Sequence, residues 1–139
     1  MSRGLLSAAA AATVAAVAAC GSPSADLFEL ERTGKGRGAK LTLLVSDGGM
    51  VTCNGKQPVA LDAERLLAAR ELARDLETQA ALGLQLKAGA KEKTTFSYEA
   101  RLEEGTIAWS DSSRGIPPAY TRLAGFARGV AKGVCKLRR

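Results

Sequence analysis

Three cysteines carry the clearest chemical potential in this sequence, at Cys20, Cys53 and Cys135. The chain of 139 residues contains no histidine. This excludes an imidazole general base, a Ser-His-Asp or Cys-His nucleophile, and a histidine-ligated metal. The three thiols therefore point to covalent modification or cross-linking rather than to catalysis.

Cys20 stands at the end of an apolar N-terminal segment. A short head that carries Arg3 precedes an uncharged run over residues 5–19, which is typical of a secretory signal and short for a membrane span of about 20 residues. The stretch Val17-Ala18-Ala19-Cys20 resembles the lipobox of bacterial lipoproteins, in which the thiol accepts a diacylglycerol before cleavage. The alternative is a plain secretory leader that leaves Cys20 in the mature chain.

The lipobox resemblance implies a division of the chain into three parts. Residues 1–19 would be a lipoprotein signal peptide, residues 20–25 the lipidated Cys20 with a Gly/Ser/Pro tether, and residues 26–139 a single domain. Five tether residues reach at most ~18 Å. We therefore expect the protein at the extracytoplasmic face of the cell membrane, anchored through diacylglyceryl-Cys20 and palmitate.

The other two cysteines form an even pair once Cys20 is lipidated. Cys53 and Cys135 lie 82 positions apart, and an oxidising compartment favours their pairing. The sequence predicts a disulfide that closes nearly the whole domain. The alternative is two buried, reduced thiols.

Alternating and helical patterns predict an α+β fold with the order β-β-β-α-β-β-α. The expected strands are residues 26–32, 40–46, 50–53, 94–102 and 106–110, and the expected helices are 62–83 and 118–134. The turn at 47–49 predicts a hairpin within an antiparallel meander of the first three strands, and the turn at 103–105 predicts a second hairpin. Because one side of each strand is polar, both helices should cover one face of an antiparallel sheet of about five strands.

Apolar residues at strand and helix spacing identify the expected core. Trp109, on an alternating strand, belongs to it. The other expected inward positions are Phe28, Leu30, Leu41, Leu43, Val45, Leu66, Ala69, Ala73, Leu76, Ala80, Phe96, Tyr98, Ala100, Leu102, Ile107, Leu123, Ala127, Val130 and Val134.

Positive charge gathers on the last predicted helix, in a chain of formal net charge +6. Arg128, Lys132 and Lys136 follow one another at a spacing of four, and Arg138 and Arg139 trail behind. They could contact an anionic membrane or envelope polymer. The alternative is a solvated helix face, since cations stabilise a helix C-terminus.

The glycine-rich stretch of residues 33–38 carries Lys35 and Arg37. It lacks the spacing of a phosphate-binding loop, and a strand rather than a helix follows it. We therefore expect a turn that could contact a partner through Lys35 and Arg37.

No further residue pattern supports an enzyme. The acidic residues form neither a spaced catalytic pair nor a calcium loop, and Ser97, Ser112 and Ser113 belong to no nucleophile motif. We expect no catalytic residue, no cofactor, no metal and no nucleic-acid partner.

Two resemblances concern the domain itself. The stretch "TCNG" at 52–55, "LLAARELARDL" at 66–76 and Cys135 are similar in pattern to small uncharacterised lipoproteins of high-GC Gram-positive bacteria. "FELERTGKGRG" at 28–38 with "LDAERLLAARELA" at 61–73 resembles emfourin-type inhibitors of thermolysin-like metallopeptidases. The second resemblance implies peptidase inhibition and carries over no inhibitory residue.

These features together favour a non-enzymatic, lipid-anchored domain that serves as a protein-binding or accessory module of the cell envelope. Its partner would be an envelope or secreted protein. Two alternatives stay open: inhibition of a secreted metallopeptidase, and a structural component that binds an anionic polymer through the basic C-terminal face.

Overall fold

A computed structural model describes residues 25–36, 38–89 and 96–137. The predicted signal peptide, Cys20, Arg37, Arg138 and Arg139 lie outside these residues. The elements are β1 (Asp26–Gly34), β2 (Leu41–Ser46), β3 (Met50–Cys53), β4 (Val59–Ala60), α1 (Ala63–Ala81), β5 (Phe96–Leu102), β6 (Gly105–Ser110) and α2 (Pro118–Gly133).

One antiparallel sheet with two helices confirms the predicted α+β class. The strands lie in the order β4-β3-β2-β1-β5-β6. β1 is central: Arg32 is paired with Leu41 of β2 on one side and with Tyr98 of β5 on the other. The two hairpins that the sequence predicts are thereby joined into one sheet through β1.

The sheet has six strands where the sequence suggested about five. The additional strand is β4, whose Val59 and Ala60 pair with Val51 and Met50. We expected a loop here, because two residues after Pro58 are too few to show the alternation that marks a strand.

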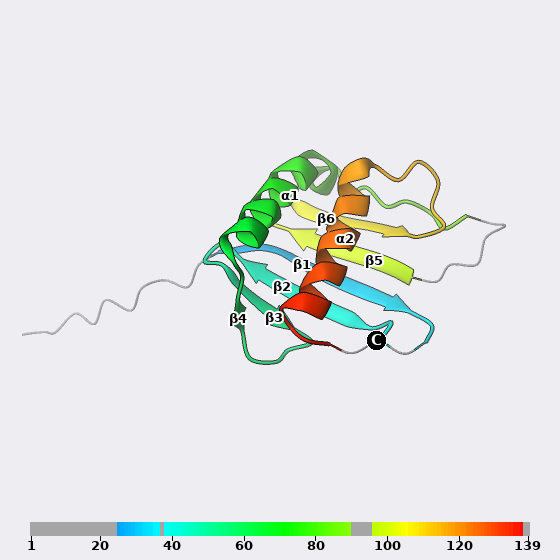
Figure 1. Cartoon of the computed structure of the whole chain (residues 1–139). Coiled ribbons are helices and arrows are strands. Elements are labelled where there is room, and N and C mark those ends of the chain that lie inside the picture. The colour runs from blue at the N-terminus through cyan, green and yellow to red at the C-terminus, as the bar shows by residue number, and fades with distance from the viewer. Residues whose placement is uncertain (1–24, 37, 90–95, 138–139) are drawn as a thin grey trace, which may run out of the picture.

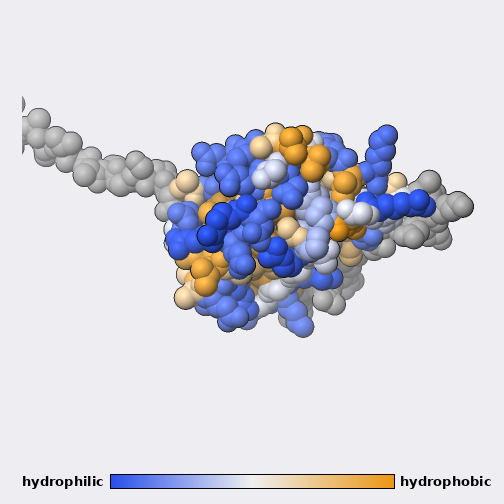
Figure 2. All heavy atoms as spheres, turned by 90° about the horizontal axis from the view of Figure 1, so that it is seen from above, coloured by the Kyte–Doolittle hydropathy of each residue, from blue (hydrophilic) through white to orange (hydrophobic). Residues whose placement is uncertain are grey.

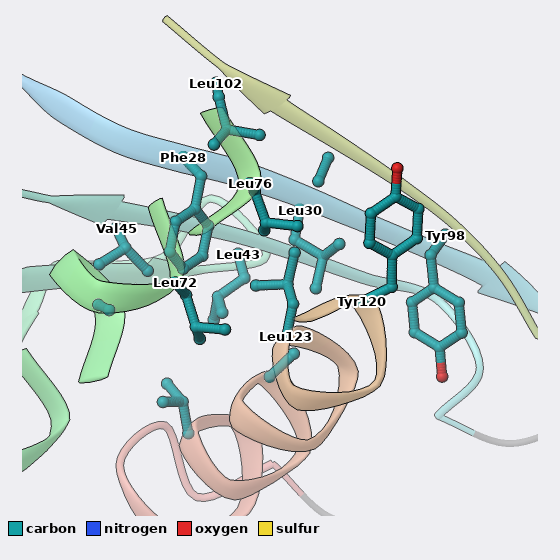
Figure 3. Close-up of a cluster of buried hydrophobic side chains, with 14 of the residues drawn as sticks. Phe28, Leu30, Leu43, Val45, Leu72, Leu76, Tyr98, Leu102, Tyr120 and Leu123 are labelled. Atoms are coloured by element: carbon teal, nitrogen blue, oxygen red, sulfur yellow. The ribbon is translucent and has the colours of Figure 1, made fainter. Parts of the chain in front are cut away.

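Both helices lie on the same face of the sheet, as Figure 1 shows. Inward side chains from the strands meet the apolar stripes of α1 and α2, and Figure 3 shows Leu30, Leu76 and Leu123 gathered between the layers. Fully buried members include Phe28, Leu43 and Ile107. Apolar surface removed from water stabilises this two-layer arrangement, at about 25 cal/mol per Å².

Helix α1 begins where the sequence predicted, since the Asp62 side chain accepts a hydrogen bond from the Arg65 backbone N–H. Its buried stripe differs slightly from the expected one. Leu72 is buried, whereas Leu66 and Ala73 are only half-buried. Helix α1 packs against both α2 and the sheet, so its inward stripe is set by two neighbours rather than by hydrophobic spacing alone.

Helix α2 ends one residue before the expected boundary, with Val134 as a half-buried cap. Lys136 then adopts a left-handed backbone with φ of 53°. The Leu137 backbone N–H donates to the Ala131 carbonyl at 2.8 Å. This turn folds the C-terminal segment back toward the sheet.

Both edges of the sheet are limited in what they can pair with. The β4 edge is only two residues long. Along β6, the Leu86 N–H donates to the Ala108 carbonyl at 2.8 Å, and the Ala108 N–H donates to the Leu84 carbonyl at 3.2 Å. The segment 84–86 therefore covers the β6 edge.

A disulfide joins Cys53, at the end of β3, to Cys135, just after α2, with Cα atoms 6.3 Å apart. This confirms the predicted pairing. The bond closes a loop with a sequence separation of 82 and ties the C-terminal segment to the sheet.

The double variant C53A/C135A is expected to lower the free energy of unfolding by about 4–5 kcal/mol, because the unfolded chain regains the entropy that the cross-link removes. Urea denaturation of both proteins measures the difference. The variant C20A, which leaves the cross-link intact, serves as the control. A loss below about 1 kcal/mol would show that the bond contributes little.

Candidate functional site

A pocket of about 340 Å³ opens at the end of the sheet where β1 finishes and β2 and β5 begin. Four cations from three elements line it: Arg32 of β1, Lys40 just before β2, and Arg128 and Lys132 of α2. We call this site the basic pocket. Its remaining lining residues are Gly38, Leu41, Asn54, Phe96, Ala131 and Leu137. Among the residues that the structure describes, no carboxylate lines the pocket.

Arg32 is held in place before any ligand arrives. Its Nε donates to the Ala39 carbonyl at 3.1 Å, and its Nη2 donates to the Gly38 carbonyl at 2.7 Å. The guanidinium carbon lies 4.9 Å from the centre of the Phe96 ring. A stacked and hydrogen-bonded guanidinium loses little rotamer freedom when an oxyanion binds.

Two of the predicted C-terminal cations, Arg128 and Lys132, line the pocket. Lys136 is exposed and is not part of the lining. Arg138 and Arg139 lie outside the described residues. The predicted loop residue Lys35 is also exposed, in the same β1–β2 connection that contributes Gly38.

The pocket cations differ in their pairing from four of the other arginines. Four ion pairs engage Arg65 with Asp62, Arg70 with Asp47, Arg101 with Glu29, and Arg122 with Asp75. Within the described part of the chain, no carboxylate pairs with Arg32, Lys40, Arg128 or Lys132. The pocket therefore concentrates positive charge that the described fold does not neutralise.

The helix C-terminus explains only part of this charge. Its partial negative charge acts within the last turn of α2, where Lys132 is the basic residue. Arg128 lies more than a turn from the end of α2, Arg32 lies on β1, and Lys40 lies in the connection before β2. The helix dipole therefore accounts for one of the four cations and leaves the other three without this explanation.

An aromatic cluster lies beside the basic pocket. Tyr98 stacks on Trp109 with ring centres 4.9 Å apart, and Trp109 lies 4.9 Å from Tyr120. The hydroxyl groups of Tyr98 and Tyr120 point in opposite directions (Figure 3). Burial raises the pKa of the Tyr98 phenol, and the nearby charges of Arg32 and Arg128 oppose that rise.

Two hollows elsewhere on the domain carry carboxylates instead. Glu31 and Glu99 line one of them, and Asp26, Glu29 and Glu103 line the other. The second of these hollows is also lined by Arg101, which pairs with Glu29. The carboxylates in both hollows make them less favourable for an anionic ligand than the basic pocket.

Other candidate chemistry is lacking in the described residues. They contain no group of three His, Cys, Asp or Glu side chains that could hold a metal ion. Ser110, Ser112 and Ser113 are buried and hydrogen-bond to one another, with Oγ–Oγ distances of 3.1 and 3.3 Å from Ser110. No helix in the described ranges is long and apolar enough to cross a membrane.

Comparison with known proteins gives no relative. No family model, curated protein or solved structure matches the chain. The resemblances to lipoproteins and to emfourin-type inhibitors remain predictions.

Sequence reasoning missed Arg32 and Lys40 as site residues. A signal was present for Arg32: it continues the inward series Phe28, Leu30 on β1, so its side chain points to the helix-covered face. A charge on that face has to lie at the end of the sheet. Lys40 gives no such signal, because it lies in a connection.

Alkaline pH is expected to weaken the fold through Tyr98 and Tyr120. Burial raises the pKa of both phenols above the ordinary value of 10.0, so the unfolded state loses protons first as the pH rises. The contribution of these two phenols to the free energy of unfolding should stay constant below about pH 10 and fall above it. Urea denaturation at several pH values, with circular dichroism, measures this.

The variants Y98F and Y120F should each make that fall shallower. At pH 7, Y120F should not lower stability, because the Tyr120 hydroxyl is buried without a hydrogen-bond partner among the described residues. If the free energy of unfolding of the double variant Y98F/Y120F fell just as steeply above about pH 10, the pH dependence would not come from these phenols.

Proposed function

We propose that this chain is a lipid-anchored, extracytoplasmic binding module that holds an anionic ligand in the basic pocket. The observation that supports it is the convergence of Arg32, Lys40, Arg128 and Lys132 on one pocket that no carboxylate of the described residues lines. Hydrogen bonds from cations to phosphate or carboxylate oxygens are among the strongest that a protein offers. The chain acts by binding rather than by catalysis.

The proposal favours an anion over a protein surface as the ligand. Protein-binding hot spots are rich in Trp, Tyr and Arg, but Trp109, Tyr98 and Tyr120 are all buried here. The β6 edge is covered and β4 is short, so the sheet offers no long edge to a partner strand. Seen from above, the surface is mostly hydrophilic and its apolar patches are small (Figure 2).

The proposal also favours a ligand on the outer side over the headgroups of the anchoring membrane. The strand β1 begins at Asp26, and Arg32 of the basic pocket lies toward its other end; Figure 1 shows β1 crossing the whole sheet between these ends. From Asp26 to Arg32, β1 covers about 20 Å at ~3.3 Å per residue. A tether from Cys20 that reaches at most ~18 Å is no longer than this distance, which favours an orientation with the pocket away from the membrane.

Binding of tripolyphosphate tests the proposal. The full chain in nonionic detergent should bind this probe, with an affinity that falls as the salt concentration rises. The variant R128Q/K132Q should lower the affinity by at least about tenfold, because hydrogen bonds to charged groups contribute about 1.5–3 kcal/mol each. Isothermal titration calorimetry measures both.

The matched control is R74Q/K87Q, which removes the same charge from two exposed residues outside the pocket. It should bind within about twofold of the unchanged protein. Equal losses of affinity in both variants would mean that binding depends on net charge alone and not on the pocket. Absence of binding by the unchanged chain would overturn the proposal.

Vesicles separate the two sources of anion. The lipidated chain is inserted into vesicles of phosphatidylcholine alone or with phosphatidylglycerol, and tripolyphosphate is added outside. Equal affinities support a pocket that opens away from the membrane. A large drop with phosphatidylglycerol would mean that headgroups occupy the pocket.

A further inference from the structure

The basic pocket continues into a second hollow of about 490 Å³, lined by Lys40, Thr42, Asn54 and Gly55. Lys40 and Asn54 line both hollows. We call the two together the groove. It begins at Arg128 and Lys132 on α2, passes the start of β2 and ends at the turn after β3. In the described ranges of the chain, neither part is lined by a carboxylate.

Asn54 is fixed at the junction of the two hollows. It adopts a left-handed backbone with φ of 52°, and its Oδ1 accepts a hydrogen bond from the Thr42 N–H at 2.9 Å. Its own backbone N–H donates to the Thr42 carbonyl at 2.8 Å. With Oδ1 engaged, the side-chain amide offers a ligand only its N–H donors.

The described side chains therefore supply donors at both ends of the groove: guanidinium and ammonium groups at one end, and the amide of Asn54 toward the other, beside the Thr42 hydroxyl, which can donate or accept. A phosphate chain carries only acceptors and matches this set. A bound peptide would bring backbone N–H groups that need acceptors, and the Gly38 carbonyl in the lining is already occupied by Arg32.

We infer that the ligand is a linear phosphate polymer, one stretch of which occupies the basic pocket while the adjoining stretch follows the groove past Asn54. The inference rests on the proposed function and names its ligand class. A single small anion would fill only the basic pocket and would leave the second hollow unused.

The dependence of affinity on polymer length tests this. The full chain is titrated with tripolyphosphate and with a long polyphosphate chain. Each association constant is divided by the number of positions along the polymer at which the site can bind. The long chain should bind at least about tenfold more tightly after this correction, because it reaches the second hollow. Equal corrected affinities would overturn the inference and leave the proposed function standing.

The variant T42V separates the two parts of the groove, because Thr42 lines only the second hollow. It removes the hydroxyl and keeps the β-branched shape of the side chain. It should weaken binding of the long chain by at least about threefold and change binding of tripolyphosphate by less than about twofold. The matched control T106V makes the same exchange on β6, outside both hollows, and should affect neither probe.

Poly-L-glutamate of similar length is the competing probe. Binding as tight as that of polyphosphate would overturn the choice of phosphate and favour an acidic polypeptide. If neither tripolyphosphate nor the long chain binds, the proposed function itself fails, which is distinguishable from loss of the length dependence alone.

Discussion

The pairing of β1 with both β2 and β5 is the constraint on which the rest of this structure depends. β1 joins two hairpins that are separated in sequence by a helix, and its inward residues Phe28 and Leu30 lie at the centre of the core. The same alternation that buries these two side chains directs Arg32 to the same face, at the end of the strand. The position of the basic pocket therefore follows from the register of the central strand.

Stability and binding are linked through the C-terminal segment. The Cys53–Cys135 bond and the hydrogen bond from Leu137 to Ala131 hold the residues after α2 against the sheet. Leu137 lines the basic pocket from this segment, and Arg128 and Lys132 line it from the last turns of α2. A cross-link that stabilises a small domain thus also fixes one wall of the candidate site.

The arginines that join elements of the fold differ in their pairing from the cations that line the basic pocket. Arginines at the hairpin turn and between the helices are paired, such as Arg70 with Asp47 and Arg122 with Asp75, and they hold elements together. Within the described part of the chain, the pocket cations have no carboxylate partner. Like charges placed close together oppose folding, so the fold tolerates this cluster at the end of the sheet where solvent screens it.

The sequence by itself determined the α+β class, the two hairpins, the capped start of α1 and the pairing of the two domain cysteines. These are local patterns, or follow from a count, so no distant contact is needed to read them. Only the tertiary structure decided that β1 lies between β2 and β5, and that Arg32 and Lys40 face Arg128 and Lys132. Residues about 90 positions apart along the chain meet through strand pairing and helix packing, which depend on the whole core. The short strand β4 was missed for the same reason, because only its pairing with β3 defines it.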